Sequence, residues 1–204
     1  MSRSLPFSEA CRRNRGPIGQ TLVQLLPDEA EVLEIGSGTG QHAVFFSALK
    51  PNWQWQCSDL AENLSGIAAR VQLEGNGRLA DPLELDVMGD HWPPGPFDAV
   101  FTANTLHIMP WDHTPVLLQR SAAVLRPGGS LMIYGPFHDD GVHTAPSNEA
   151  FDRSLKSRDP LMGVRDAHTI KALASDSGLE AAADLAMPAN NRFLIFRKTD
   201  AAPM

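Results

Sequence analysis

Residues 32–40, VLEIGSGTG, place three glycines within five positions, directly after a short apolar run. The segment EVLEI predicts a buried strand that ends at glycine. The segment QHAVFFSALK that follows predicts a helix stopped by Pro51. A glycine loop between a strand and a helix exposes backbone N–H groups and the positive end of the helix to a ligand. The stretch therefore predicts a binding site for an anion or a nucleotide-like ligand.

The spacing of the glycines separates the possible ligand classes. A P-loop needs a lysine followed by serine or threonine, and GSGTGQHA has neither. The dinucleotide pattern is G-x-G-x-x-G, whereas Gly36, Gly38 and Gly40 form G-x-G-x-G. Glu34 would repel a pyrophosphate but would suit a ligand with cationic or donor groups; alternatively it is only a charge at a strand end. The pattern E-x-G-x-G-x-G resembles the first motif of class I methyltransferases that use S-adenosylmethionine (SAM), which carries an ammonium and a sulfonium but no phosphate.

Strands and helices alternate along the rest of the chain, which predicts right-handed βαβ units and a parallel sheet. We expect residues 180–188 and 191–198 to close the sheet as an antiparallel pair. We expect residues 136–160, rich in Gly, Pro, His and Asp, to form a long surface segment. Further strands are predicted at 53–59, 82–87, from 97 and at 130–137, and further helices at 17–26, 62–75, 112–125 and 166–179, with a turn at 126–129.

Two carboxylates follow predicted strands at the positions where such a sheet binds its ligand. Asp59 lies 19 residues after Gly40 at the end of the second strand. There it can accept from both hydroxyls of a ribose, although dinucleotide enzymes use the same contact. Asp86 ends the third strand and matches the methyltransferase position that accepts from the adenine amine, with Val87 against the ring; alternatively it is a cap or turn residue. Both lie at the carboxyl edge of the predicted sheet.

A second resemblance covers nearly the whole chain and is more specific than the glycine loop. Its blocks are RNRGPI (13–18), SGTGQHAVFF (37–46), NTLHIMPW (104–111), GPF (135–137), SNEAFDRSLKSRDPLMGVRD (147–166) and MPANN (187–191). They resemble the family called domain of unknown function 938, a group of small methyltransferase-like proteins. The resemblance implies an α/β fold with a Rossmann-like, seven-stranded class I methyltransferase sheet. That sheet is mostly parallel with one antiparallel strand and has helices on both faces. The resemblance implies a SAM site but supplies no reaction.

The predicted cofactor site draws on several segments of one expected domain, residues 1–204. Residues 1–30 would form an N-terminal arm and helix, and 136–160 an active-site loop. Because a segment before the first strand often covers the SAM pocket in this fold, we expect the arm to fold over the cofactor and meet a carboxylate; alternatively its arginines are solvated. The cofactor-binding residues that we predict are Asn14, Arg15, Glu34, Gly36, Ser37, Gly38, Gly40, Asp59, Leu60, Asp86, Val87 and Asn104.

Few residues need to act chemically, because methyl transfer from a sulfonium depends mainly on alignment of the reacting atoms. His107 is a candidate general base or acceptor-binding group, or else a histidine packed at a helix start. Tyr134, the only tyrosine, would orient an acceptor or simply pack with its hydroxyl bonded. HDDGVH (138–143) has the ligand types of a divalent-metal site, but we favour a polar loop and predict no metal.

Composition limits the remaining possibilities. The net charge of −7 argues against a general nucleic-acid binder, although residues 1–20 carry four arginines against one glutamate. Cys11 and Cys57 form no metal or redox spacing, and the first residues lack a secretory h-region, so we expect a cytoplasmic setting without a membrane partner. We expect a monomer or homodimer that methylates a small molecule. The alternatives are an NAD-dependent reductase on a similar sheet and a catalytically silent SAM-binding module.

Overall fold

The computed structural model describes residues 5–75, 77 and 79–199. Two compact units make up the chain, and each is described by itself. Unit 1 takes Met1–Trp92 and Phe97–Phe101, and unit 2 takes Pro93–Pro96 and Thr102–Met204. Seven strands form a sheet in the order β3-β2-β1-β4-β5-β10-β9, and three more form a small sheet in the order β7-β6-β8. No helix within the described ranges is long and apolar enough to cross a membrane.

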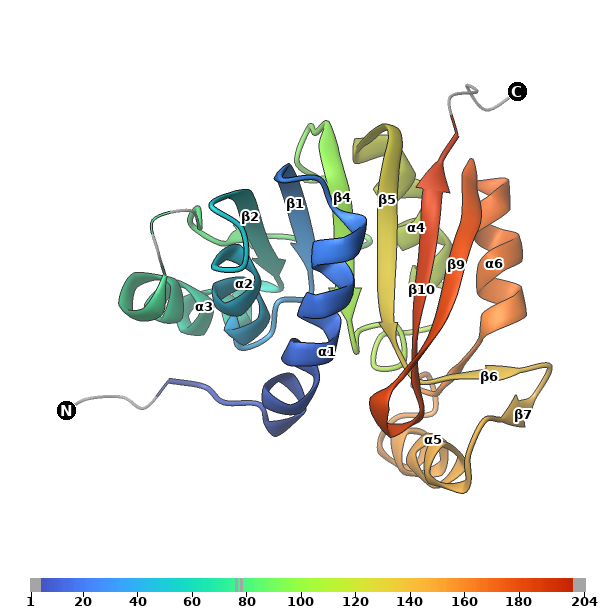
Figure 1. Ribbon diagram of the computed structural model, residues 1–204. Helices are drawn as coiled ribbons and strands as arrows, with labels where there is room; N and C mark the ends of the chain where they lie inside the picture. The colour runs from blue at the N-terminus through green and yellow to red at the C-terminus, as the bar shows by residue number, and fades with distance from the viewer. Residues whose placement is uncertain (1–4, 76, 78, 200–204) are drawn as a thin grey trace. The chain divides into compact units, whose positions relative to one another are not determined.

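Unit 1 holds the glycine loop and the first βαβ units (Figure 1). Its elements are α1 (Glu9–Leu25), β1 (Glu29–Ile35), α2 (Gln41–Ser47), β2 (Asn52–Asp59), α3 (Ala61–Glu74), β3 (Leu83–Glu84) and most of β4 (Phe97–Ala103). β1 and β2 are parallel with Ile35 opposite Ser58, and β2 and β3 are parallel with Asp59 opposite Glu84. The carboxyl ends of these three strands therefore lie at one edge, and the predicted ligand residues follow them.

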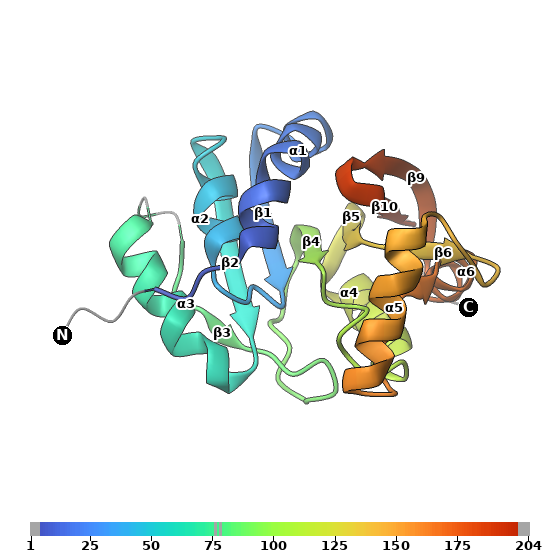
Figure 2. The ribbon, with the colours of Figure 1, turned by 90° about the horizontal axis from the view of Figure 1, so that it is seen from below.

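An aromatic cluster fills the core of unit 1. The rings of Phe46, Trp55 and Phe101 lie 5.3 to 5.7 Å apart and are almost entirely buried. Such tilted and edge-on pairs add to the stabilisation that burial of apolar area provides. Because Phe46 lies on α2 and Trp55 on β2, the cluster anchors the helix that follows the glycine loop, and α1 and α2 lie side by side in both ribbon views (Figures 1 and 2).

Unit 2 completes the chain with an antiparallel closure. Its elements are α4 (His113–Val124), β5 (Leu125–Gly135), β6 (Phe137–Asp139), β7 (Val142–His143), α5 (Pro146–Arg158), β8 (Arg165–Asp166), α6 (Ala167–Asp176), β9 (Leu179–Met187), a short 3-10 turn (Pro188–Asn190) and β10 (Asn191–Lys198). β10 runs antiparallel to both β5 and β9, with Phe193 opposite Tyr134. The predicted antiparallel pair is thereby confirmed, as is the mostly parallel seven-stranded α/β sheet.

Residues 136–160 differ from the expected long surface segment. They form β6, β7 and the 13-residue helix α5, which lies with β6 near the tip of the β9–β10 hairpin (Figures 1 and 2). Pro146 is compatible with α5 because it occupies the first turn, where its missing N–H costs nothing. The same residue type signals a loop when only the sequence is read.

Three other boundaries differ from the sequence expectation. α1 begins at Glu9 rather than at residue 17, because the Ser8 side chain caps it and the helix continues through Pro17. The third strand shrinks to Leu83–Glu84. The expected turn at 126–129 lies instead within β5.

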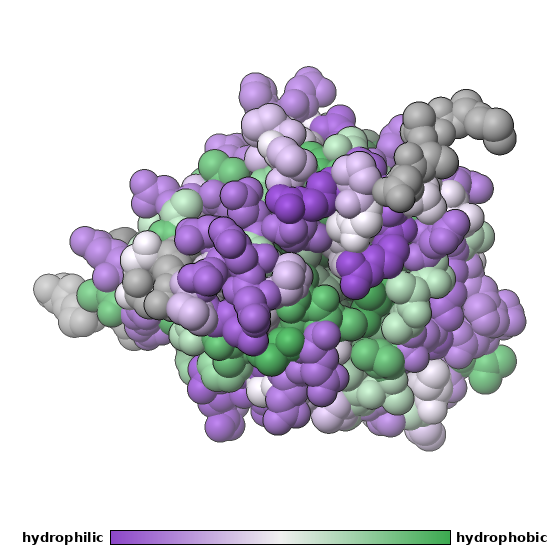
Figure 3. All heavy atoms as spheres, turned by 45° about the horizontal axis from the view of Figure 1, so that its top comes forward, coloured by the Kyte–Doolittle hydropathy of each residue, from purple (hydrophilic) through white to green (hydrophobic). Residues whose placement is uncertain are grey.

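On the face in Figure 3, hydrophilic side chains predominate and hydrophobic ones form a smaller exposed area, as expected when most large apolar residues are internal.

Candidate functional site

The glycine loop holds its backbone in a conformation that other residues rarely adopt. Gly36, Gly38 and Gly40 have φ of +71°, +57° and +71°. At Gly38 no atom would lie within 4 Å of an added Cβ, so the protein's own packing does not require the missing side chain. The space above Gly38 is therefore free for the close approach of a ligand. Ser37 fixes the loop to β2, since its N–H donates to the Ser58 carbonyl at 2.9 Å.

Asp59 is built into the same loop. Its Oδ2 accepts from the Gly38 N–H at 2.6 Å, and its Oδ1 accepts from the Leu60 N–H and from Asn63 Nδ2, each at 2.8 Å. The side chain is 8% exposed, so these three donors orient a nearly buried carboxylate. Two carboxylate oxygens offer about four lone-pair directions, which leaves acceptor capacity for a ligand. Sequence reasoning predicted Asp59 but not its bond to Gly38.

Three predicted residues extend this edge of unit 1. The Leu85 N–H donates to the Asp59 carbonyl at 2.9 Å, which sets Asp86 and Val87 beside the end of β2. Asp86 is exposed, and its Oδ1 accepts from the Met88 N–H at 2.9 Å, the turn contact that was the alternative reading. Val87 is buried, whereas Leu60 offers an exposed apolar side chain.

Glu34 lies beneath the loop rather than on the surface. It is 1% exposed, and its Oε2 accepts from Trp55 Nε1 at 2.9 Å. Its Oε1 lies 3.9 Å from His42 Nδ1. Burial, together with the nearby charge of Asp59, raises the pKa of Glu34 to about 7, although the Trp55 bond opposes this. Near neutral pH this carboxyl therefore stands between its neutral and charged forms.

The predicted residues Asn14 and Arg15 lie on α1 and contact α2. Asn14 Oδ1 lies 2.7 Å from His42 Nε2, and the Arg15 guanidinium lies over the Phe45 ring at 4.8 Å from its centre. His42 is buried, and desolvation, with the charge of Arg15, lowers its pKa to about 4. Its imidazole is therefore neutral at physiological pH. Sequence reasoning missed His42, for which the only signal was its position two residues after the last glycine.

Three predicted residues lie in unit 2, after β4 and at the end of β5. Asn104 has φ of +60°, a conformation that asparagine tolerates better than most residues, and its N–H donates to the Tyr134 carbonyl at 2.8 Å. Tyr134 is buried, with its ring 6.1 Å from that of Phe193. The structure thus brings Asn104 and Tyr134 together through their backbones.

His107 lies in a segment that Arg165 fixes. The Arg165 side chain donates to the carbonyls of Leu106 and Met109 at 3.0 and 2.6 Å, and the Gly163 N–H donates to the His107 carbonyl at 3.0 Å. His107 is 6% exposed, and burial together with the Arg165 charge lowers its pKa to about 4. Its ring is therefore neutral at physiological pH. Sequence reasoning missed Arg165, which comes from a distant part of the chain.

The segment 138–143 belongs to a cluster of histidines and carboxylates in unit 2. Ligand atoms of Asp140, Asp166 and His168 lie within 4.8 Å of one another. His168 Nδ1 lies 3.0 Å from Asp140 Oδ2, and Asp166 accepts from the N–H groups of Asp140 and Thr169. These bonds within the cluster explain its arrangement by the fold alone, and we assign it no ligand.

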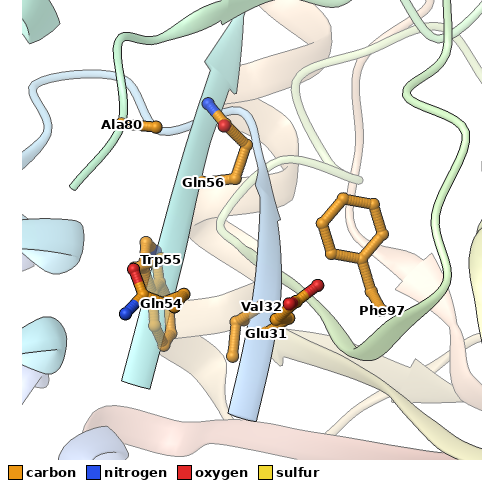
Figure 4. A pocket seen from close by; sticks show the side chains of 7 residues that line it. All are labelled: Glu31, Val32, Gln54, Trp55, Gln56, Ala80 and Phe97. Carbon is orange, nitrogen blue, oxygen red and sulfur yellow. The ribbon is translucent and has the colours of Figure 1, made fainter. Parts of the chain in front are cut away.

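Two hollows have linings that contain no residue of the glycine loop. In unit 1 a cavity of about 150 Å³ lies beside β1 and β2, lined by Glu31, Val32, Gln54, Trp55, Gln56, Ala80 and Phe97 (Figure 4). It is smaller than the roughly 300–1,000 Å³ of ordinary ligand pockets. In unit 2 a hollow of about 470 Å³ is lined in part by Asn190, Asn191 and Arg192. Its arginine is already paired with Asp139 and Asp184.

Similarity to solved structures establishes the fold. An O-methyltransferase family protein from Burkholderia thailandensis has a TM-score of 0.77 at 17% identity, over 92% of this chain and 60% of that one. The mitomycin 7-O-methyltransferase MmcR has a TM-score of 0.79 at 18% identity, over 93% of this chain and 54% of that one. CalO1, a methyltransferase in calicheamicin biosynthesis in its SAH-bound form, has a TM-score of 0.70 at 17% identity, over 84% of this chain and 49% of that one.

This chain therefore spans at most 60% of the length of these three proteins. At such low identities the likeness bears on architecture alone, and it agrees with the Rossmann-like methyltransferase sheet that the motifs predicted. A family model described as "Protein of unknown function (DUF938)" matches residues 5–198, nearly the whole chain. The chain belongs to this family, as the blocks from RNRGPI to MPANN indicated.

Proposed function

We propose that the protein is a SAM-dependent methyltransferase that acts on a small-molecule acceptor. The observation that carries the proposal is the bond between the Asp59 carboxylate and the Gly38 N–H. This bond connects two features of the site. One is a carboxylate that can accept from ribose hydroxyls, and the other is a loop whose backbone leaves room for a ligand. The methyltransferase architecture of the similar structures supports the same conclusion.

The polar groups at the edge of unit 1 fit SAM better than a phosphate-bearing nucleotide. The loop contains no lysine, and a carboxyl group, Glu34, lies directly beneath it. In the proposed assignment the loop residues Gly36, Ser37, Gly38 and Gly40 face the amino-acid part of SAM. The remaining contacts are the ribose with Asp59 and Leu60, the adenine with Asp86 and Val87, and further polar contacts from Asn14, Arg15 and Asn104. Glu34 acts on the cofactor site from beneath the loop, where it is 1% exposed.

When bound, SAM supplies a methyl group activated by its sulfonium. The chain's own task is then mainly alignment, which in well-oriented reactions is worth an effective molarity of roughly 10⁵–10⁸ M. A proton acceptor is needed only when the acceptor molecule must lose a proton. Because its pKa is about 4, His107 is neutral at physiological pH and can take up a proton, although it is a weak base. We propose Tyr134 as the residue that orients the acceptor.

The proposal is tested by methyl transfer itself. The protein is incubated with SAM labelled in its methyl group and with fractionated metabolite pools, and label is sought in new products. Transfer to a small molecule is expected, and the product identifies the acceptor atom. Tight binding of S-adenosylhomocysteine (SAH) with no transfer across all pools would instead favour the silent SAM-binding module.

A further inference from the structure

The described residues before α1, Leu5–Ser8, form an arm that is bonded to the glycine loop through two shared side chains. We propose that docking of this arm sets the affinity of the loop for its cofactor, with Arg70 and Gln41 as the positioning residues. That the ligand of the loop is SAM rests on the proposed function. The coupling between arm and loop is a property of unit 1 that can be measured without any ligand.

Arg70 makes the first connection. It lies on α3, is 5% exposed, and donates from Nε to the Thr39 carbonyl at 2.7 Å and from Nη2 to the Pro6 carbonyl at 2.5 Å. Its Nη1 donates to Glu74 at 2.5 Å, which holds the guanidinium in place. Thr39 stands between Gly38 and Gly40. One rigid planar group therefore ties the arm to the centre of the loop.

Gln41 makes the second connection with opposite polarity. Its Oε1 accepts from the Ser8 N–H at 2.6 Å and from the Thr39 hydroxyl at 2.9 Å. Gln41 is buried and is the first residue of α2. The arm thus offers a carbonyl and an N–H, the loop offers the two polar groups of Thr39, and each shared side chain contacts one group from each. If the arm leaves, Arg70 and Gln41 each lose one of the partners that hold them in the position from which they bond to Thr39.

Little apolar burial holds the arm in place. Phe7 is 58% exposed, and the arm residues Leu5 and Phe7 line a hollow of about 490 Å³ with side chains of α2 and α3. Pro6 lies close to α3, since a Cβ added to Gly66 would lie 2.9 Å from Pro6 Cγ (the arm passes α3 in Figure 2). A segment with so few buried apolar contacts belongs to the low-stability end of a protein. Its docking is therefore sensitive to small changes in the free energy of the loop.

The coupling has to be reciprocal. If the docked arm increases the affinity of the loop for its ligand by some factor, the ligand must increase docking of the arm by the same factor. Docking can be followed at the Ser8 amide, whose N–H is held by Gln41. The order of the loop can be followed at the amide of Gly40, which donates to the Ser37 carbonyl at 2.9 Å.

Gly66→Ala is the discriminating variant, because it displaces Pro6 without touching Arg70, Gln41 or the loop. Alanine favours a helix over glycine, so α3 should keep its structure. Ser65→Ala, at an exposed position of the same helix, is the matched control. Deletion of residues 1–6 removes the Pro6 carbonyl but keeps Ser8, the cap of α1, and serves as the second variant.

Hydrogen exchange of both amides and calorimetric titration with SAH are measured for the full-length protein and for each variant. In Gly66→Ala and in the deletion variant we expect faster exchange at Ser8 and at Gly40, and SAH affinity reduced about tenfold, a factor typical of coupling between two sites. Unchanged exchange at Gly40 in the deletion variant would overturn the coupling, whether or not SAH binds. If the full-length protein does not bind SAH at all, the proposed function fails, and exchange at Gly40 alone decides the coupling.

Discussion

Replacement of Asp59 by asparagine tests the ribose assignment with a minimal change of shape. The amide can keep an oxygen toward Leu60 and Asn63, but its NH₂ then faces the Gly38 N–H across a contact that is now 2.6 Å. Loss of that bond to a charged group should lower the free energy of unfolding by about 1.5–3 kcal/mol. Typical domains are stable by roughly 5–15 kcal/mol, so the variant should still fold.

The effect on the cofactor should be of similar size. The asparagine has no charge and can accept from only one of the two ribose hydroxyls. Loss of one bond to a charged acceptor corresponds to about 1.5–3 kcal/mol, or a Kd for SAH that is roughly 10- to 150-fold higher. Calorimetric titration with SAH measures it, and urea unfolding verifies the fold.

Asn63→Ala is the control, because it removes one neutral partner of the carboxylate and keeps the charge. It should change the Kd by much less than Asp59→Asn. A folded Asp59→Asn protein with wild-type affinity would refute the ribose role of Asp59.

Gly38→Val should abolish SAH binding and lower stability, because it forces a branched side chain to φ of +57° and fills the space above the loop. Unchanged affinity for SAH in calorimetric titration would mean that the loop is only a turn. Glu34 has its pKa raised by burial from 4.5 to about 7, so its contribution to stability is full below pH 4.5 and falls by roughly 3 kcal/mol as the pH rises to 7. The difference in urea stability between wild type and Glu34→Gln, measured from pH 4.5 to 8, should follow that decline, and a flat difference would contradict the buried carboxyl. His107→Gln should slow labelled methyl transfer while leaving the Kd for SAH unchanged, and equal turnover would exclude His107 as the base.

The sequence was most informative where a short pattern determines local structure. The glycine loop and the end of β2 at Asp59 follow from glycine spacing and strand periodicity, both of which are local signals. The antiparallel closure followed from two strand patterns separated by a turn at 188–190. These features depend on residues that are neighbours in the chain, so one sequence suffices to predict them.

The features that escaped prediction depend on contacts between distant residues. Arg70 joins positions 6 and 39, and Arg165 joins its own segment to the carbonyls of Leu106 and Met109. An arginine in a sequence normally indicates a solvated position, and no periodicity reveals which carbonyls it reaches. The burial of Glu34 was missed for the same reason, since its partner Trp55 lies 21 residues away on the neighbouring strand.

Calorimetric titration of the wild-type protein with SAH and, separately, with NAD tests whether the glycine loop binds SAM rather than a dinucleotide. Both ligands carry an adenosine, but only NAD carries a pyrophosphate, the group that the loop sequence and Glu34 are proposed to disfavour. We expect saturable binding of SAH and no measurable binding of NAD. Binding of NAD without binding of SAH would contradict this expectation and would favour a reductase on this sheet.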